Sequence, residues 1–478
     1  MKSLYRTYLF WIARVGAIFG LTHSLKRRLL FGAFANSLGK VWVILIQLVS
    51  IPVLTYKWGA SGYGVWMILT AVPTYIGLSD FGFGTAAAAD MTRKVGVGDM
   101  AGALEAFQSV WALLSIVSAL VVVIAFSLWI YRGPIAGMTG LPIPAENISA
   151  TVLILVLYSV LAIQMAMLST GYRSTQRYAI GTLLLDALIP AEGLAIIVTV
   201  VTNGGFMRAA LSMLLVRSLG FLIYYRILRR FEPWIRIGWT HLSLDEIGRL
   251  APPAFASLGA NFSSALGLQG VVLAIGAAIS PTAAGVFGAS RTIARIPLQI
   301  AGLAVRASIP EMTVAHARED GSLFTRLVVS NLLLTAAIVL LISIVLMTYG
   351  SWTIQTLSHG RLHASFFLVF WLLLAAGLQA GWTTVGQFLF AINRQQKFAH
   401  YYFSFAAATV FAPFLFKMND ALEKVAVVSA IAELGMLIVT SRVWWRETSM
   451  TYSQIMAAVR WLLSYMRKYA HRIPHIGR

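Results

Sequence analysis

Long apolar runs recur along nearly the whole chain, and they limit its fold more than any other feature of the sequence. A run of about 20 apolar residues can cross a bilayer as an α-helix, at about 1.5 Å per residue. Hydrophobic residues occupy 59% of the 478 positions and charged residues only 11%, which excludes a soluble globular protein. The chain is therefore expected to be an integral membrane protein.

The apolar runs have the pattern of helices. A chain inside a bilayer must pair its backbone polar groups internally, and only helices and closed barrels do so. The runs show no sustained alternation of apolar and polar residues, as barrel strands would. We therefore expect an all-α protein with about twelve spans. They are predicted near 30–56, 63–89, 104–131, 150–170, 177–202, 206–228, 250–279, 282–310, 324–350, 364–391, 398–417 and 421–444.

Basic residues predict how these spans are oriented. Loops on the side of the N-terminus carry most of the lysines and arginines. The other side carries only Lys57, Arg132, Arg361, Lys417 and Lys424. Because basic loops stay in the cytoplasm, both termini are predicted to be cytoplasmic. The net charge of +20 then reflects topology and attraction to anionic membrane lipids, and no nucleic acid partner is expected.

A faint internal repeat relates the two halves of the chain. A shift of 221 positions pairs Gly64 with Gly285 and Asp99 with Asp320. Because each half contains six spans, an even number, the halves are expected to form two lobes related by a pseudo-two-fold axis along the membrane normal, with a central cavity. The predicted regions are an interfacial segment (1–28), an N-lobe (29–230), a cytoplasmic linker (231–249), a C-lobe (250–446) and a cytoplasmic amphipathic tail (447–478).

Cationic residues inside the predicted spans suggest an anion site. Arg291 and Arg295 are four residues apart and share a helix face, and Arg306 returns to nearly the same direction. The positions that the repeat makes equivalent are Thr70, Thr74 and Thr85. Guanidinium groups in a low-dielectric cleft suit a diphosphate, so we predict that Arg291, Arg295 and Lys40 bind one. Arg306 and Arg217 are further candidate cavity charges.

Arg291, Arg295 and Lys40 have an alternative explanation, because an intramembrane cation often pairs with an acid or extends its charge to the membrane interface. The candidate acids, which could also act in gating or ion coupling, are Asp80, Asp186, Glu192 and Glu433. Asp80 lies between glycines near the cytoplasmic end of its span, where it could bond the backbone, pair with a loop arginine or titrate. Asp186 and Glu192 flank a proline but are six residues apart, so a paired-carboxylate site is not supported. Coupling to a proton or sodium gradient stays open.

Other chemistry has little support in the sequence. There is no cysteine, and His359 and His363 lack a further metal-ligand motif, so no metal site is predicted. No glycine-rich phosphate loop with its lysine is present, which argues against direct use of ATP. No cofactor is expected, and the protein is predicted not to be an enzyme.

One stretch resembles a known family. GYGVWMILT (62–70), GLSDFGFGTA (77–86) and the basic loop that ends in GD resemble the Wzx-type polysaccharide-unit flippases of the MOP exporter superfamily. The resemblance implies that the protein moves an undecaprenyl-diphosphate-linked oligosaccharide from the cytoplasmic to the periplasmic leaflet of a bacterial inner membrane, by alternating access. The product would be a surface polysaccharide such as O-antigen of lipopolysaccharide or exopolysaccharide. A polysaccharide polymerase and chain-length proteins are implied as partners.

Two other functions remain open from the sequence. A MATE-like drug exporter would share the two-lobed plan, but many such drugs are cationic and the predicted arginines would repel them. A membrane-embedded glycan polymerase would be expected to carry large extramembrane loops or many carboxylates. The predicted outer loops are short and nearly free of acids.

Overall fold

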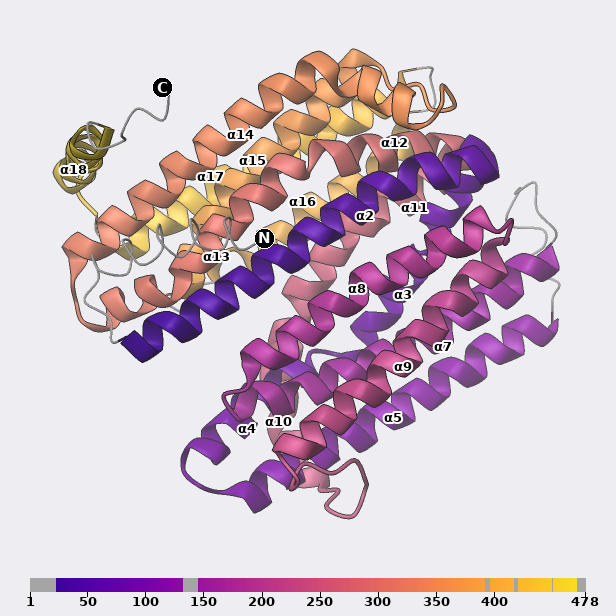
Figure 1. Ribbon diagram of the computed structural model, residues 1–478, viewed down its shortest axis with the longest axis horizontal. Helices are drawn as coiled ribbons and strands as arrows, with labels where there is room; N and C mark the ends of the chain where they lie inside the picture. Colours follow the sequence, from indigo (N-terminus) through magenta and orange to yellow (C-terminus); the bar gives the residue numbers. More distant parts are fainter. Residues whose placement is uncertain (1–22, 132–144, 392–395, 417–419, 449, 471–478) are drawn as a thin grey trace, which may run out of the picture.

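The computed structural model describes residues 23–131, 145–391, 396–416, 420–448 and 450–470. The described chain is helical, and two groups of long helices lie side by side (Figure 1). Helices satisfy the backbone polar groups within each apolar segment, which a bilayer requires. The predicted interfacial segment lies largely outside the described residues, since its first 22 positions are not included.

The first bundle contains the six spans of the predicted N-lobe. Its second span comprises the end of α2 after Gly59, then α3, a short 3₁₀ turn (η1) and α4. The elements are α2 (His23–Leu69), α3 (Ala71–Gly77), η1 (Leu78–Asp80), α4 (Phe83–Gly96), α5 (Met100–Tyr131), α7 (Ala145–Ser174), α8 (Tyr178–Val201) and α9 (Phe206–Phe231).

The second bundle contains the remaining six spans and is followed by the C-terminal helix α18. A π-helical turn (η2) interrupts its first span. The elements are α10 (Leu244–Ala265), η2 (Leu266–Gly270), α11 (Val271–Ala278), α12 (Pro281–Ala294), α13 (Ile296–Ala317), α14 (Gly321–Leu357), α15 (Phe366–Ala391), α16 (Gln396–Leu415), α17 (Ala421–Thr448) and α18 (Tyr452–Ala470).

The outer faces of the bundles are apolar. Leu219 on α9, Leu341 on α14 and Phe411 on α16 each have more than 60% of their surface exposed, which suits contact with lipid chains. Within the described residues, eight helices are individually long and apolar enough to cross a membrane. The other predicted spans correspond to interrupted or more polar helices, such as the pair α12 and α13.

The two bundles repeat one packing scheme. In the first, α4 packs on α5, α5 on α7, and both α7 and α8 on α9. In the second, α13 packs on α14, α14 on α15, and both α15 and α16 on α17. Asp99 and Asp320, which the repeat makes equivalent, also form the same contact. Each carboxylate accepts a hydrogen bond from the backbone N–H three residues later, at the start of α5 or α14. The lobes therefore share a scaffold.

The break predicted at 57–62 is present, because two helices meet within α2 at Gly59, whose φ of 73° is not helical. Two of the predicted spans, however, contain interior breaks that were not predicted. The second span breaks at Phe81 and Gly82, both in the left-handed region, where glycine removes the steric penalty. The eighth span ends at Ala294 and restarts at Ile296. The length of an apolar run does not show such breaks, because the segments on both sides of each break remain apolar.

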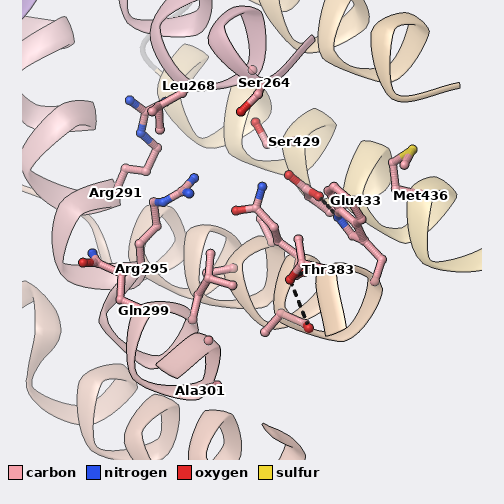
Figure 2. A pocket seen from close by; sticks show the side chains of 18 of the residues that line it. Ser264, Leu268, Arg291, Arg295, Gln299, Ala301, Thr383, Ser429, Glu433 and Met436 are labelled. Atoms are coloured by element: carbon pink, nitrogen blue, oxygen red, sulfur yellow. Dashed lines mark hydrogen bonds between the residues drawn. The ribbon is translucent and has the colours of Figure 1, made fainter. Parts of the chain in front are cut away.

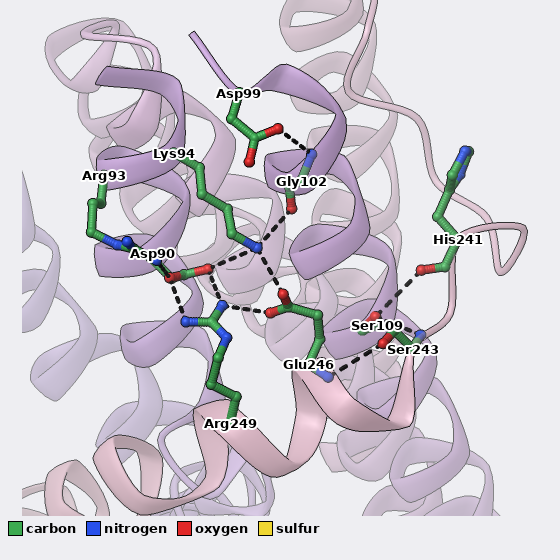
Figure 3. Close-up of polar contacts among 10 residues, drawn as sticks. All are labelled: Asp90, Arg93, Lys94, Asp99, Gly102, Ser109, His241, Ser243, Glu246 and Arg249. Carbon is green, nitrogen blue, oxygen red and sulfur yellow. Dashed lines mark hydrogen bonds and ion pairs between the residues drawn. The ribbon is translucent and has the colours of Figure 1, made fainter. Parts of the chain in front are cut away.

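The segment that connects the bundles belongs structurally to the first. The Gln108 side chain on α5 donates to the Arg236 carbonyl and accepts from the His241 backbone N–H. Ser243 caps α10 by accepting from the Glu246 backbone N–H, and its own N–H donates to Ser109 (Figure 3). The predicted linker is thus held against α5.

A cluster of charges then fixes the first turns of α10 to α4 (Figure 3). The guanidinium of Arg249 donates to both oxygens of Asp90, at 2.9 and 2.6 Å. Lys94 donates to Glu246 at 2.9 Å, and Arg93 donates to Asp90 at 2.9 Å. Burial alone would raise the pKa of the Asp90 carboxyl, but hydrogen bonds from Arg249 and Arg93 hold that pKa well below its usual range.

The bundles meet closely where α2 crosses α12. A methyl group added to Gly64 would lie 1.7 Å from the Pro281 carbonyl oxygen, and one added to Gly285 would lie 3.1 Å from the Ala60 carbonyl oxygen. The shift of 221 that relates the lobes pairs 60 with 281 and 64 with 285. This contact, here called the glycine seal (residues 60–64 and 281–285), therefore joins equivalent segments of the two lobes.

Candidate functional site

A cavity of about 550 Å³ lies within the second bundle, and α2 contributes to one wall through Val43 and Gln47. Its other walls come from α10, η2, α11, α12, α13, α15, α16 and α17. The volume is in the range of ligand-binding pockets. Figure 2 shows polar side chains pointing into this space from several of these helices.

Arg291 and Arg295 supply the positive charge of the cavity (Figure 2). Arg291 lies in the last turn of α12, and Arg295 is the residue at which α12 ends and α13 begins. Unsatisfied carbonyls at a helix C-terminus favour nearby cations, so the break supports both charges. The Arg291 guanidinium also lies 5.7 Å from the centre of the Phe287 ring.

No carboxylate in the described part of the chain forms an ion pair with Arg291 or Arg295. Glu433 on α17 lines the same cavity but accepts a hydrogen bond from the Trp382 indole. The sequence alternative, in which intramembrane acids pair directly with these two arginines, is therefore not seen among the described residues, although Glu433 is near enough for its charge to act on Arg295. An unpaired guanidinium within a membrane-spanning bundle is energetically costly unless water or an anionic ligand solvates it.

The other predicted cationic residues lie in different places. Arg306 lines the cavity and is exposed. Lys40 lies in α2, three residues before the cavity residue Val43, but its side chain is outside the described residues. Arg217 is not among the cavity-lining residues; it lies between helices of the first bundle.

Arg217 belongs to a buried polar cluster with Glu192 and Tyr158. Its guanidinium nitrogens lie 2.6 and 2.8 Å from the two Glu192 carboxylate oxygens, and Tyr158 donates to Glu192 at 2.9 Å. The side chains of Arg217 and Glu192 are only 11% and 6% exposed. Because α7, α8 and α9 each contribute one residue, the cluster joins three helices of the N-lobe.

The remaining predicted acids are also separate from the cavity. Asp80 accepts a hydrogen bond from the Gly82 backbone N–H at 2.9 Å, so it stabilises the break between η1 and α4. Asp186 is buried on α8 and faces α2, since a methyl group on Gly39 would lie 2.6 Å from the Asp186 Cβ. Among the four candidate acids, only Glu433 lines the cavity.

Sequence reasoning missed the uncharged polar residues of the cavity. Gln379, Thr383 and Gln387 on α15 line it, together with Tyr402 and Phe405 on α16. The i, i+4, i+8 spacing on α15 was visible in the sequence. An apolar span with a few amides does not by itself indicate a site, however, because such residues often bond within a helix bundle.

Comparisons with known proteins show that the fold of this chain is similar to those of solved transporters. No family model and no curated protein matches the chain. An inward-facing multidrug resistance MATE family transporter of the MOP superfamily is similar with a TM-score of 0.64 and 15% identity, over 85% of this chain and 98% of that one. The MATE multidrug transporter DinF-BH, solved with R6G, has a TM-score of 0.64 and 14% identity, over 87% and 94%.

A third similar structure differs from these two in its description. It is a MOP superfamily transporter from Pyrococcus furiosus, described as having a binding pocket of reverse polarity that suggests a different function. Its TM-score is 0.57 at 12% identity, over 86% of this chain and 95% of that one. At these identities the likeness concerns the fold. The chain is therefore a multi-pass membrane protein with the two-lobed, twelve-helix fold of the MOP superfamily.

Proposed function

We propose that this protein is a transporter that flips an undecaprenyl-diphosphate-linked oligosaccharide from the cytoplasmic to the periplasmic leaflet by alternating access. The observation that carries the proposal is the pair Arg291 and Arg295, which line a membrane-embedded cavity and form no direct ion pair with a carboxylate among the described residues. Two guanidinium groups four residues apart can donate forked hydrogen bonds to the oxygens of a diphosphate. The lipid chain would remain in the bilayer while the head group enters the cavity.

The arrangement of the lobes supports alternating access. Two bundles of one design meet at the glycine seal, where rigid-body rocking could open or close a path. The distribution of basic loops predicts that this seal lies on the periplasmic side. A seal there suits a state that loads its substrate from the cytoplasm, and one of the similar transporters was solved in an inward-facing state.

The second candidate function is export of cationic drugs. It is favoured by Glu433, a carboxylate in the cavity that could hold a cation, and by the likeness to multidrug transporters. Three arginines line the same cavity, and their combined field would repel a cation. We therefore rank the anionic lipid-linked glycan first. Glu433 is also the acid best placed to couple transport to a proton or sodium gradient.

The test measures flipping of a labelled undecaprenyl-diphosphate-linked oligosaccharide in liposomes that contain the purified protein. The variant Arg291→Ala/Arg295→Ala should lose about a hundredfold or more of the flipping rate, because each charge-assisted contact contributes about 1.5–3 kcal/mol. The matched control is Arg208→Ala/Arg226→Ala, which removes two exposed arginines of α9 that do not line the cavity.

The control variant should flip the lipid at the wild-type rate. Equal flipping by the cavity variant would contradict the proposed diphosphate site. Wild-type protein that exports rhodamine 6G but does not flip the lipid would favour the drug exporter instead.

A further inference from the structure

A polar, uncharged stripe forms part of the cavity wall beside the arginines. Gln379, Thr383 and Gln387 all line the cavity from α15. Positions i, i+4 and i+8 lie on one face of a helix, and they extend over about 12 Å at a rise of about 1.5 Å per residue. Figure 2 shows Thr383 across the cavity from Arg295.

The amides of this stripe have no protein partner among the described residues. Gln379 is buried, with 9% of its surface exposed, yet neither Gln379 nor Gln387 forms a side-chain hydrogen bond there. The Thr383 hydroxyl donates to the Gln379 main-chain oxygen at 2.6 Å and leaves both amide groups available. A buried amide without a partner is costly, so these groups require water or a polar ligand.

Aromatic side chains lie beside the stripe. Tyr402 and Phe405 of α16 line the cavity, and the Tyr402 ring is 5.0 Å from the ring of Trp382. An amide donates and accepts hydrogen bonds at once, as does each hydroxyl of a sugar. Amides next to aromatic faces therefore match a neutral polyhydroxylated ligand, whose C–H faces pack on rings while its hydroxyls bond the amides.

The stripe occurs in one lobe only. Helix α7 holds the place in the N-lobe that α15 holds in the C-lobe, and a shift of 220 relates their C-terminal ends. The equivalent positions are Ser159, Ile163 and Met167. The amides are thus not part of the scaffold that both lobes share, and in this respect they resemble the arginine pair.

We propose that Gln379, Thr383 and Gln387 form a carbohydrate subsite that binds the sugar next to the diphosphate held by Arg291 and Arg295. This inference rests on the proposed function. It adds that the cavity recognises two parts of the head group separately, an anion on α12 and a neutral saccharide on α15.

The experiment compares binding of two probes to the purified full-length protein in nanodiscs. One probe is undecaprenyl diphosphate, and the other is the same lipid carrying N-acetylhexosamine sugars. The variant Gln379→Leu/Gln387→Leu should bind the sugar-bearing lipid at least tenfold more weakly than wild type and the bare lipid with unchanged affinity. Gln379→Ala/Gln387→Ala serves as a second version in case leucine disturbs packing. The matched control is Gln164→Leu, an amide of α7 outside the cavity.

The two proposals fail in different ways. If the stripe variants bind both probes as wild type does, or lose both equally, the carbohydrate subsite is wrong. If Arg291→Ala/Arg295→Ala binds both probes normally, the diphosphate site and with it the proposed function are wrong. Loss of both probes in the arginine variant, with loss of only the sugar-bearing lipid in the stripe variants, is the expected result.

Discussion

Asp90 is the residue on which the contact between α4 and α10 depends most. Its carboxylate accepts from Arg93 and Arg249 and lies 3.3 Å from the Lys94 amine. Its side chain is 6% exposed, so replacing it leaves the surrounding charges partly buried without an acid. Because α10 begins the second bundle, this residue helps to determine how the two lobes are tied together.

We expect Asp90→Asn to lower the stability of the protein by about 1.5–3 kcal/mol at pH 7, the usual contribution of hydrogen bonds to charged groups. The folded-state pKa of Asp90 is depressed, so its stabilisation is fully present above the ordinary value of 3.8 and is lost as the pH falls below it. Melting temperatures between pH 7 and pH 3 should show a gap between wild type and variant that narrows below about pH 4. A gap that is constant over this range would contradict this role.

A buried ion pair joins two helices of the N-lobe, α8 and α9. Glu192 on α8 and Arg217 on α9 lie in the interior of the lobe, with Tyr158 of α7 bonded to the same carboxylate. Glu192 was a candidate for ion coupling on the basis of sequence alone. Its observed partners suggest a role in packing these helices.

Removing one member of this ion pair should lower the stability of the protein more than removing both. Glu192→Gln leaves the Arg217 guanidinium buried without a carboxylate, and we expect a loss of about 3–5 kcal/mol in unfolding free energy. Glu192→Gln/Arg217→Met should recover most of that loss, as measured by thermal unfolding in detergent. Glu319→Gln, an exposed position, is the control and should have no effect. A double variant that is stable but cannot transport would indicate a coupling role instead.

The molecule as a whole is organised around the contact of its two repeats. The glycine seal joins α2 to α12 with backbone atoms in direct contact, a closeness that only glycine permits at position 64. Next to it, a methyl group on Gly288 would lie 3.6 Å from the Met67 Cγ. If transport requires the lobes to separate here, a covalent link at this point should stop it.

The natural absence of cysteine makes this test direct. We expect Met67→Cys/Gly288→Cys to form a disulfide on oxidation, because a Cβ at position 288 would lie 3.6 Å from the Met67 Cγ, which marks where a cysteine sulfur would lie. The oxidised protein should lose flipping activity in liposomes, and a reductant should restore it. The matched control is Val339→Cys/Gly377→Cys, where a methyl group on Gly377 would lie 3.2 Å from the Val339 Cγ1 inside the second bundle. Full activity of the oxidised Met67→Cys/Gly288→Cys protein would show that the seal does not open during transport.

Sequence alone sufficed for the features that depend on local composition. The lengths of the apolar runs predicted a membrane fold with about twelve spans, because the thickness of the hydrocarbon core sets how many residues a helix needs to cross it. The shift of 221 predicted two lobes, and the spacing of Arg291 and Arg295 placed these two on one side of a helix, since helical geometry is regular over short distances. Arg306 follows on α13, beyond a break that the spacing did not predict. All three arginines do line the cavity.

Tertiary structure was needed wherever residues distant in the sequence had to meet. Only the packing of α8 on α9 decides that Glu192 pairs with Arg217, whereas Arg291 and Arg295 are left facing a cavity. The bond between Asp90 and Arg249, 159 residues apart, and the contact of Gly64 with Gly285 likewise depend on how helices approach one another. Hydrophobicity determines that a segment enters the membrane. Since all the membrane helices are similarly hydrophobic, this property cannot select which helices pack together, and side-chain shape and charge in three dimensions make that choice.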